Sequence, residues 1–188
     1  MKTELYIFDM GGVVVRNFDV FPLIYEFLQV SREKFGSLSE DKFGLVSDGN
    51  LSETEFWRFF SKNYGSEVKP DLFKIYFQPE VKPEVIAKIS ELKKQARVVC
   101  GTNTIDSHYR CHLERGDYDI FDQVYASNKI GISKPNPDFF NYILEREKVH
   151  PTACCFIDDS MENISTAKAL GLKTVLFTGS EVLTDLEY

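Results

Sequence analysis

The sequence predicts an α/β fold in which a parallel sheet is covered by helices on both faces. Five short runs rich in β-branched and aromatic residues alternate with segments of helical periodicity. The runs are almost continuously apolar, which is typical of strands that are buried on both faces. Residues 17–82 interrupt this alternation with helical patterns and no convincing strand. We therefore expect a layered α/β/α core with a helical insertion after its first strand.

The expected strands span residues 5–8, 97–102, 123–126, 154–157 and 173–177. The clearest helix begins at Pro83, where a proline suits the first turn, and carries one apolar face through Val85, Ile89 and Leu92. Further helices are expected over 138–148 and over 162–170, the latter closed by Gly171. These elements assign residues 1–16 and 83–188 to the core.

The insertion, residues 17–82, is expected to form a small helical domain with helices over 21–30, 40–46, 53–63 and 71–77. Ser52 and Glu55 have the spacing of a capping box before the third of these helices. The aromatic residues that follow, Trp57 among them, have a spacing more typical of a packed core than of a ligand pocket.

Composition excludes several classes of function. A net charge of −7, without a run of Lys or Arg, argues against a nucleic-acid-binding protein. No stretch has the length of a membrane span, and the N-terminal apolar run, broken by Asp9, does not resemble a signal peptide. Four cysteines without paired metal-ligand spacing suit buried thiols in a reduced compartment. We expect a cytoplasmic protein, either a monomer or a homodimer.

Polar residues follow the ends of the expected strands. In an open parallel sheet, ligands bind beyond the carboxyl ends of the strands, so these side chains should share one crevice. They are Asp9, Thr102, Asn103, Lys134, Asp158 and Asp159. Three carboxylates converging on one crevice repel one another unless a cation is present. A hard divalent ion with oxygen ligands, most simply Mg²⁺, is therefore expected.

Four segments in this order resemble the motifs of the haloacid dehalogenase-like hydrolase superfamily. They read FDMGGV, VVCGT followed by Asn103, KPNP with Lys134, and FIDDSMEN. The insertion lies where that family places its cap, and the family's core is a Rossmann-like three-layer α/β/α fold. The first motif is closest to phosphatases that read FDLGN or FDLGG there, a group that includes glucose-1-phosphate phosphatase.

The resemblance implies hydrolysis of a small phosphorylated metabolite through an aspartyl-phosphate. Asp9 would be the nucleophile, and Thr102 and Asn103 would bind the phosphoryl oxygens. Lys134 would neutralise their charge and hold Asp9 ionised, and the Lys134–Pro135 bond would be cis, as in several relatives.

The resemblance also implies a Mg²⁺ site. Asp9 and Asp159 would bind the ion directly, and Gly11 would contribute its backbone carbonyl oxygen. Asp158 would act one step away and orient bound water. Asn163 is expected to orient its neighbours in this motif rather than to contact the substrate.

Gly11 departs from the family pattern, because most of these phosphatases have an acid–base aspartate there. Without it, we expect a substrate with a good leaving group, such as a sugar 1-phosphate or an acyl phosphate. Alternatively, Asp19, Asp48 or Glu53 of the insertion would supply the acid. Two other interpretations stay open: a weak or inactive module that binds phosphate and Mg²⁺, and a 2-haloacid dehalogenase, which would need no metal.

The insertion is expected to set substrate specificity, with Phe18, Asp19, Phe21 and Trp57 as candidates. His108 and His112 lie four residues apart after the second strand and are expected to be solvated helix residues.

Overall fold

The computed structural model describes residues 2–69, 71–184 and 186. Its centre is a parallel sheet with the strand order β5-β4-β1-β6-β7. The strands are β1 (Leu5–Phe8), β4 (Arg97–Thr102), β5 (Gln123–Ala126), β6 (Cys154–Asp158) and β7 (Lys173–Leu176). The predicted parallel α/β fold is confirmed, and the predicted strand ends agree to within one residue.

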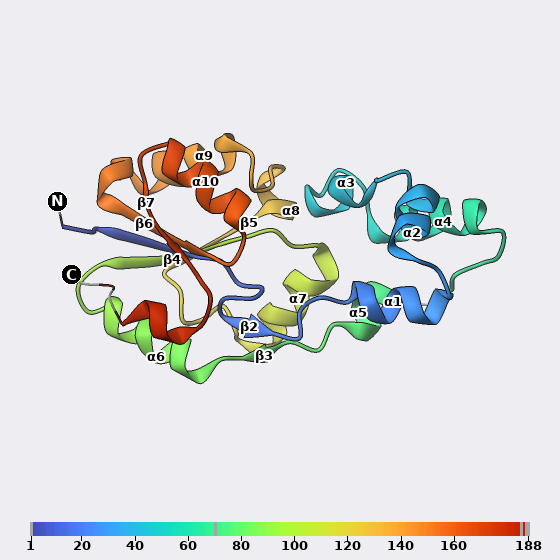
Figure 1. Ribbon diagram of the computed structural model, residues 1–188, viewed down its shortest axis with the longest axis horizontal. Coiled ribbons are helices and arrows are strands. Elements are labelled where there is room, and N and C mark those ends of the chain that lie inside the picture. Colours follow the sequence, from blue (N-terminus) through green and yellow to red (C-terminus); the bar gives the residue numbers. More distant parts are fainter. Residues whose placement is uncertain (1, 70, 185, 187–188) are drawn as a thin grey trace.

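Helices cover both faces of this sheet (Figure 1). They are α6 (Pro83–Leu92), α7 (Asp106–Arg115), α8 (Ser127–Ile130), α9 (Pro137–Glu147) and α10 (Met161–Ala169), with short 3-10 turns η1 (Pro151–Ala153) and η2 (Ser180–Leu183). The predicted helices at Pro83, at 138–148 and at 162–170 are all present, and Gly171 follows the last with a positive φ of 89°.

The alternation of side chains along β1 explains the two layers. Leu5 and Ile7 belong to the apolar cluster that contains residues of α9 and α10. Tyr6 and Phe8 point to the opposite face, where they join a cluster with residues of α6 and η2. Because every residue of β1 is buried, this strand lies at the centre of the molecule and fixes the position of Asp9, the residue that follows it.

Helices α1 to α5, which we call the helical lobe, pack beside the sheet at the carboxyl ends of its strands (Figure 1). They are α1 (Phe21–Leu28), α2 (Arg32–Ser39), α3 (Phe43–Ser47), α4 (Glu53–Tyr64) and α5 (Leu72–Tyr76). A cluster of buried aromatic and aliphatic side chains holds them together. The capping box of Ser52 and Glu55 is confirmed.

Two predictions for this segment need correction. The helix expected over 40–46 instead begins at Phe43. Helix α2 was not predicted, because its sequence is largely polar and only one face, with Phe35, Leu38 and Ser39, is buried. Residues 17–82 also contain a strand, β3 (Glu80–Val81), which pairs with β2 (Val15–Arg16). Strands of two residues are too short to show a period of two in the sequence.

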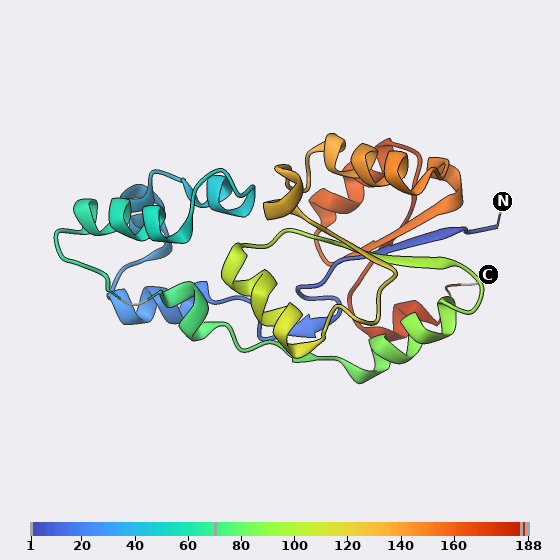
Figure 2. The same ribbon diagram turned by 180° about the vertical axis from the view of Figure 1, so that it is seen from behind.

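This β2–β3 ribbon joins the helical lobe to the core where the chain leaves and returns (Figure 2). Lys82 extends the ribbon, since its backbone N–H donates to the carbonyl of Val14 at 2.9 Å.

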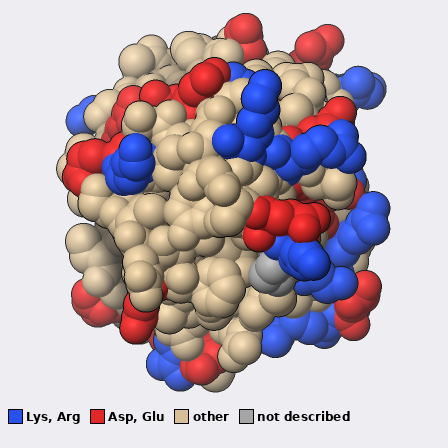
Figure 3. All heavy atoms as spheres, turned by 90° about the vertical axis from the view of Figure 1, so that its right-hand side faces the viewer, with Lys and Arg blue, Asp and Glu red and all other residues tan. Residues whose placement is uncertain are grey.

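The end of the molecule formed by the helical lobe carries acidic and basic side chains around its edge and a largely uncharged middle (Figure 3). Such a face does not have the single-sign basic surface of a nucleic-acid-binding protein. Among the described residues, no helix combines the length and apolar character needed to cross a bilayer.

Candidate active site

The sheet register brings the polar strand ends together, as the sequence predicts. β1 lies between β4 and β6, with Phe8 opposite Cys100 on one side and Ile157 on the other. Asp9 therefore emerges between Thr102, at the end of β4, and Asp158, at the end of β6.

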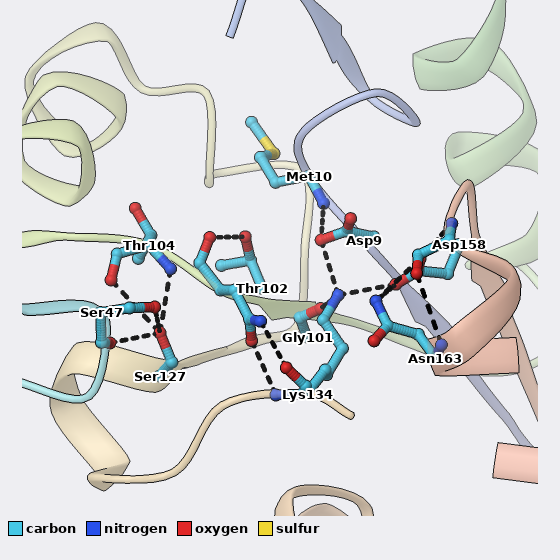
Figure 4. Close-up of polar contacts among 12 residues, drawn as sticks. Asp9, Met10, Ser47, Gly101, Thr102, Thr104, Ser127, Lys134, Asp158 and Asn163 are labelled. Carbon is cyan, nitrogen blue, oxygen red and sulfur yellow. Dashed lines mark hydrogen bonds and ion pairs between the residues drawn. The ribbon is translucent and has the colours of Figure 1, made fainter. Parts of the chain in front are cut away.

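Lys134 is the centre of this site (Figure 4). Its Nζ lies 2.8 Å from Asp9 Oδ1, 2.8 Å from Asp158 Oδ2 and 2.8 Å from the carbonyl oxygen of Gly101. The side chain is 1% exposed. Three acceptors match the three donors of an ammonium group, so the buried positive charge is paired and fully hydrogen-bonded.

Asp9 sits in a strongly perturbed environment. Burial raises the pKa of Asp9 to about 7, while the Lys134 ammonium works in the opposite direction and the negative charge of Asp158 adds to the rise. The backbone N–H of Met10 also donates to Asp9 Oδ1 at 2.8 Å. A cation bound beside Asp9 would favour its ionised form.

Asp158 is held by the segment that follows β6. Its Oδ1 accepts hydrogen bonds from the backbone N–H of Ser160 at 2.8 Å and from Asn163 Nδ2 at 3.0 Å. Its other oxygen accepts from Asn163 and from Lys134. Asn163 thus holds its neighbour Asp158 as expected, and Asp158 in turn orients Lys134, while the expectation that Asn163 does not contact the substrate stays a prediction.

The three aspartates fit a divalent cation. Asp9, Asp158 and Asp159 each offer a carboxylate oxygen, and these oxygens lie within 4.8 Å of one another. Partial burial, together with the charge of Asp158, raises the pKa of Asp159. Both the oxygen donors and the mutual repulsion suit a hard ion such as Mg²⁺.

Gly11 and Gly12, which follow Asp9 closely, are glycines for different structural reasons. Gly12 has a φ of +78°, and a Cβ there would stand 2.0 Å from Asp159 Oδ2, so a side chain would invade the acidic cluster. Gly11 has no such backbone requirement. A Cβ at Gly11 would lie 2.8 Å from Cδ2 of Phe18, whose ring therefore covers the position of the missing acid.

Thr102 and Asn103 lie beside Lys134, and Thr102 is buried. The side chain of Asn103 is engaged with the backbone of Lys134, donating to its carbonyl oxygen and accepting from its N–H, both at 2.8 Å. The Lys134–Pro135 bond is cis, as predicted. Asn103 therefore positions the lysine segment, and contact of Thr102 and Asn103 with a phosphoryl group stays a prediction.

A cavity of about 410 Å³ lies next to Lys134 and Asn103, between the core and the helical lobe. On the side of the lobe its lining includes the rings of Phe18, Phe21 and Phe43. Of the four residues expected to set specificity, Phe18, Asp19 and Phe21 line this cavity. Trp57 does not, since it packs in the interior of the lobe and donates its Nε1–H to Asp71 at 3.3 Å.

The three candidate acids of the insertion also differ in whether they line this cavity. Asp19 and Asp48 line the cavity. Asp19 accepts the N–H of Phe21 at 3.0 Å, and Asp48 accepts a short hydrogen bond from Ser133. Glu53 instead lines a separate hollow.

The expectation for the two histidines is wrong, because both are packed rather than solvated. His108 stacks on Phe77 with 3.6 Å between ring centroids, and its Nε2 lies 3.0 Å from the carbonyl oxygen of Phe73. His112 is 3% exposed and is hydrogen-bonded to Asp117 at 2.8 Å. Burial lowers the pKa of both, that of His108 to about 4. Their partners lie far along the chain or in a turn, so no local sequence pattern indicates this packing.

Ser127 and Lys82 were missed. Ser127 follows β5 and is fully buried, and its hydroxyl contacts Thr104 of the core and Ser47 of the helical lobe (Figure 4). The rule of inspecting residues after each strand would have found it. Lys82 lies on the ribbon, where its Nζ makes a short hydrogen bond to the Gly12 carbonyl, a contact between distant segments.

The sheet order and the buried group of Lys134 with two aspartates define an α/β enzyme that works at the carboxyl ends of its strands. The family model of haloacid dehalogenase-like hydrolases matches residues 3–171. The chain belongs to this family, and the prediction of a hydrolase is confirmed.

Several characterised proteins are similar along most of this chain. D-ribitol-5-phosphate phosphatase of Bacteroides thetaiotaomicron is 26% identical over 89% of this chain and 88% of its own. The sesquiterpene phosphatase astK of Aspergillus oryzae is 25% identical over 93% and 89%. Drimenol cyclase drtB of Aspergillus calidoustus is 27% identical over 79% of this chain, which spans 30% of that protein.

Solved structures of the family share the fold. A haloacid dehalogenase family enzyme of Bacteroides thetaiotaomicron superimposes with a TM-score of 0.81 at 22% identity, covering 93% of each chain. The complex of that enzyme with magnesium and inorganic phosphate has a TM-score of 0.73 at 24% identity, covering 92% of this chain and 93% of that one. The narrower likeness to glucose-1-phosphate phosphatase stays a prediction.

Proposed function

We propose that this hydrolase is a Mg²⁺-dependent phosphatase that cleaves a small phosphomonoester through an aspartyl-phosphate on Asp9. The observation that carries the proposal is the position of Lys134, whose Nζ lies 2.8 Å from both Asp9 and Asp158 in a buried site. A buried cation beside a reactive carboxylate suits an anionic substrate, since it offsets the charge of the phosphoryl group. The relatives named as phosphatases support the same class of reaction.

The reaction has two steps. Asp9 Oδ1 is held by Met10 and Lys134, so Oδ2 is the oxygen that attacks phosphorus. The bond from phosphorus to the ester oxygen breaks, and the alcohol leaves with the electron pair and takes a proton from water. A water molecule then attacks the phosphorus of the aspartyl-phosphate, which releases inorganic phosphate and restores the Asp9 carboxylate.

Asp9, Asp159 and the backbone carbonyl of Gly11 would hold the metal, and Asp158 would support it from one step away. The ion, when bound, neutralises negative charge on the phosphoryl group. Lys134 adds positive charge beside Asp9 for the same purpose, because it is fixed by Asp158 and by the Gly101 carbonyl.

The helical lobe acts as the cap of this active site in our proposal. It contributes the aromatic side of the cavity next to Lys134. Gly11 removes the usual acid–base group, a loss of roughly 10²- to 10⁴-fold for esters whose leaving group needs protonation. This loss favours substrates with good leaving groups, among which the sequence favours a sugar 1-phosphate.

The test is turnover of p-nitrophenyl phosphate, whose leaving group needs no acid. We expect activity that requires Mg²⁺, that EDTA abolishes and that Asp9→Asn lowers by at least about 1000-fold. Asp119→Asn is the matched control, since Asp119 is exposed and lies between α7 and β5, before the amino end of that strand rather than at a carboxyl end.

Two further measurements separate the other interpretations. Halide release from a 2-haloacid, with no effect of EDTA, would mark a dehalogenase. Binding of Mg²⁺ and phosphate without turnover of any ester would indicate an inactive binding module, the interpretation that the absence of an acid at Gly11 supports.

A further inference from the structure

The wall of the cavity beside Lys134 is aromatic. Phe21 and Phe43 meet edge to face, with 4.8 Å between their ring centroids and 80° between their planes. Phe18 is 38% exposed, lines the same cavity and covers Gly11, two residues from the nucleophile. Val20 and Ile105 add aliphatic surface. An aromatic surface thus extends from the reacting end of the site into the helical lobe.

The polar groups around this wall already have partners within the protein. Asp48 accepts from Ser133, the Ser47 hydroxyl lies 3.2 Å from that of Ser133, and the Thr104 N–H donates to Ser127. The imidazole of His108 and the carboxylate of Asp19 are engaged as described above. An aromatic ring leaves all of these hydrogen bonds in place, whereas the hydroxyls of a polyol would have to share acceptors, such as Asp19 and Asp48, that already hold a partner.

The residues next to Asp9 restrict the leaving group of the substrate, independently of the shape of the cavity. Gly11 supplies no acid, so the leaving oxygen must depart as a stable anion. A phenol, with a pKa of about 10, is a far better leaving group than an aliphatic alcohol. Planar rings also pack well against aromatic side chains, each such pair contributing about 0.5–1.5 kcal/mol beyond its buried area.

We infer that the substrate is the phosphate monoester of a phenol, rather than the sugar 1-phosphate that the sequence favours, with its aromatic ring held against Phe18, Phe21 and Phe43. This inference rests on the proposed phosphatase activity and names its substrate class. A cavity of about 410 Å³ lies within the range that binds small ligands and admits one or two fused rings. In the first step the phosphorus–phenol oxygen bond breaks, the phenolate leaves with the electron pair, and Asp9 carries the phosphoryl group.

The experiment compares kcat/KM for 1-naphthyl phosphate, phenyl phosphate, glucose 1-phosphate and acetyl phosphate with Mg²⁺ present. Naphthol and phenol are similar leaving groups, so their esters differ mainly in ring area. We expect 1-naphthyl phosphate to exceed phenyl phosphate by about 5-fold or more and glucose 1-phosphate by a wider margin. Acetyl phosphate has a good leaving group and no ring, and it reports on phosphoryl transfer alone.

Substitutions in the aromatic wall then test where the ring of the substrate binds. Phe18→Leu and Phe43→Leu keep apolar bulk and remove the aromatic surface, so each should lower kcat/KM for 1-naphthyl phosphate about 5- to 10-fold more than for acetyl phosphate. Phe27→Leu is the matched control, because Phe27 is 53% exposed on α1 and does not line the cavity. Thermal melts verify folding, and should Phe43→Leu fail to fold, the exposed Phe18 carries the test.

The outcomes separate this inference from the proposed function. If turnover of acetyl phosphate depends on Asp9, the proposed phosphatase activity holds. A preference for glucose 1-phosphate, or equal losses of activity in all three variants, would then overturn the inference of a phenol ester alone. Absence of turnover for every ester overturns both.

Discussion

The two sides of the cavity are built on different principles. On the side of the core, charged groups are fixed by contacts next to strand ends, as Lys134 is by Asp9, Asp158 and Gly101. On the side of the helical lobe, aromatic rings such as Phe21 and Phe43 hold one another in place. The core side therefore determines which reaction is possible, and the lobe side determines which molecule undergoes it.

The largest effect is expected from breaking the charge network of the core side. Lys134→Met leaves two buried carboxylates without their cation and should cost about 3–5 kcal/mol of the free energy of unfolding, along with most of the activity. Added Mg²⁺ should restore part of the lost stability, because it supplies positive charge to the same aspartates. Thermal and urea unfolding with and without Mg²⁺ measure both effects.

Lys129→Met is the matched control for this substitution. Lys129 forms an ion pair with Asp106 at 2.6 Å, but both side chains are nearly half exposed. Its loss should change the free energy of unfolding by less than about 1 kcal/mol. Equal effects of the two substitutions would refute the view that the core side depends on a buried charge network.

The second test acts where the two sides meet, at Gly11 and Phe18. Gly11→Asp alone places its Cβ 2.8 Å from the Phe18 ring and should gain little activity on an ester with a poor leaving group, such as glycerol 3-phosphate. In a Phe18→Ala background the new acid has room. There we expect Gly11→Asp to raise kcat by about 10-fold or more, the lower end of what a positioned acid contributes.

Acetyl phosphate, an acyl phosphate, is the control substrate, because its leaving group needs no proton and should gain nothing from the acid. A gain from Gly11→Asp that is the same with and without the Phe18 ring would contradict the idea that this ring occupies the place of the acid.

The same contrast explains what could be read from the sequence. The strands were predictable because buried parallel strands are continuous apolar runs, and Asp9 and Asp158 follow directly from where those strands end. Lys134 was found as a polar residue beyond the strand expected at 123–126, although it lies several residues past β5, and its role came from the resemblance to a family motif. Local sequence thus carries most of the core side.

The lobe side depends on packing between distant segments, which no local pattern records. The ring of Phe18 over Gly11, the stacking of His108 on Phe77, and the two-residue ribbon strands all fall in this class. The sequence correctly indicated that Trp57 belongs to a core cluster, since helical spacing of aromatic residues usually means burial. It could not indicate which aromatic residues remain at the surface of a cavity.

The smallest expected effect concerns a contact that joins the two sides, at Glu53. This residue begins α4 of the lobe, and its Oε1 accepts a hydrogen bond from the backbone N–H of Ser107 in the core at 2.7 Å. Burial raises the pKa of Glu53 from 4.5 to about 7. Between these two pH values the folded state binds more protons than the unfolded chain, so stability falls as pH rises through this window.

Glu53→Gln keeps an acceptor oxygen for Ser107 and cannot titrate, so the melting temperature should fall less between pH 5 and pH 7.5 than in the wild type. We expect a difference of about 2–4 °C, which corresponds to roughly 1 kcal/mol in a domain of this size. Glu55→Gln is the control, because hydrogen bonds from Ser52 lower the pKa of Glu55 and move its titration below this window. A wild-type slope that persists in Glu53→Gln would mean that the contact between lobe and core does not depend on this proton, and that other contacts, such as the hydrogen bond from Ser133 to Asp48, join the two parts.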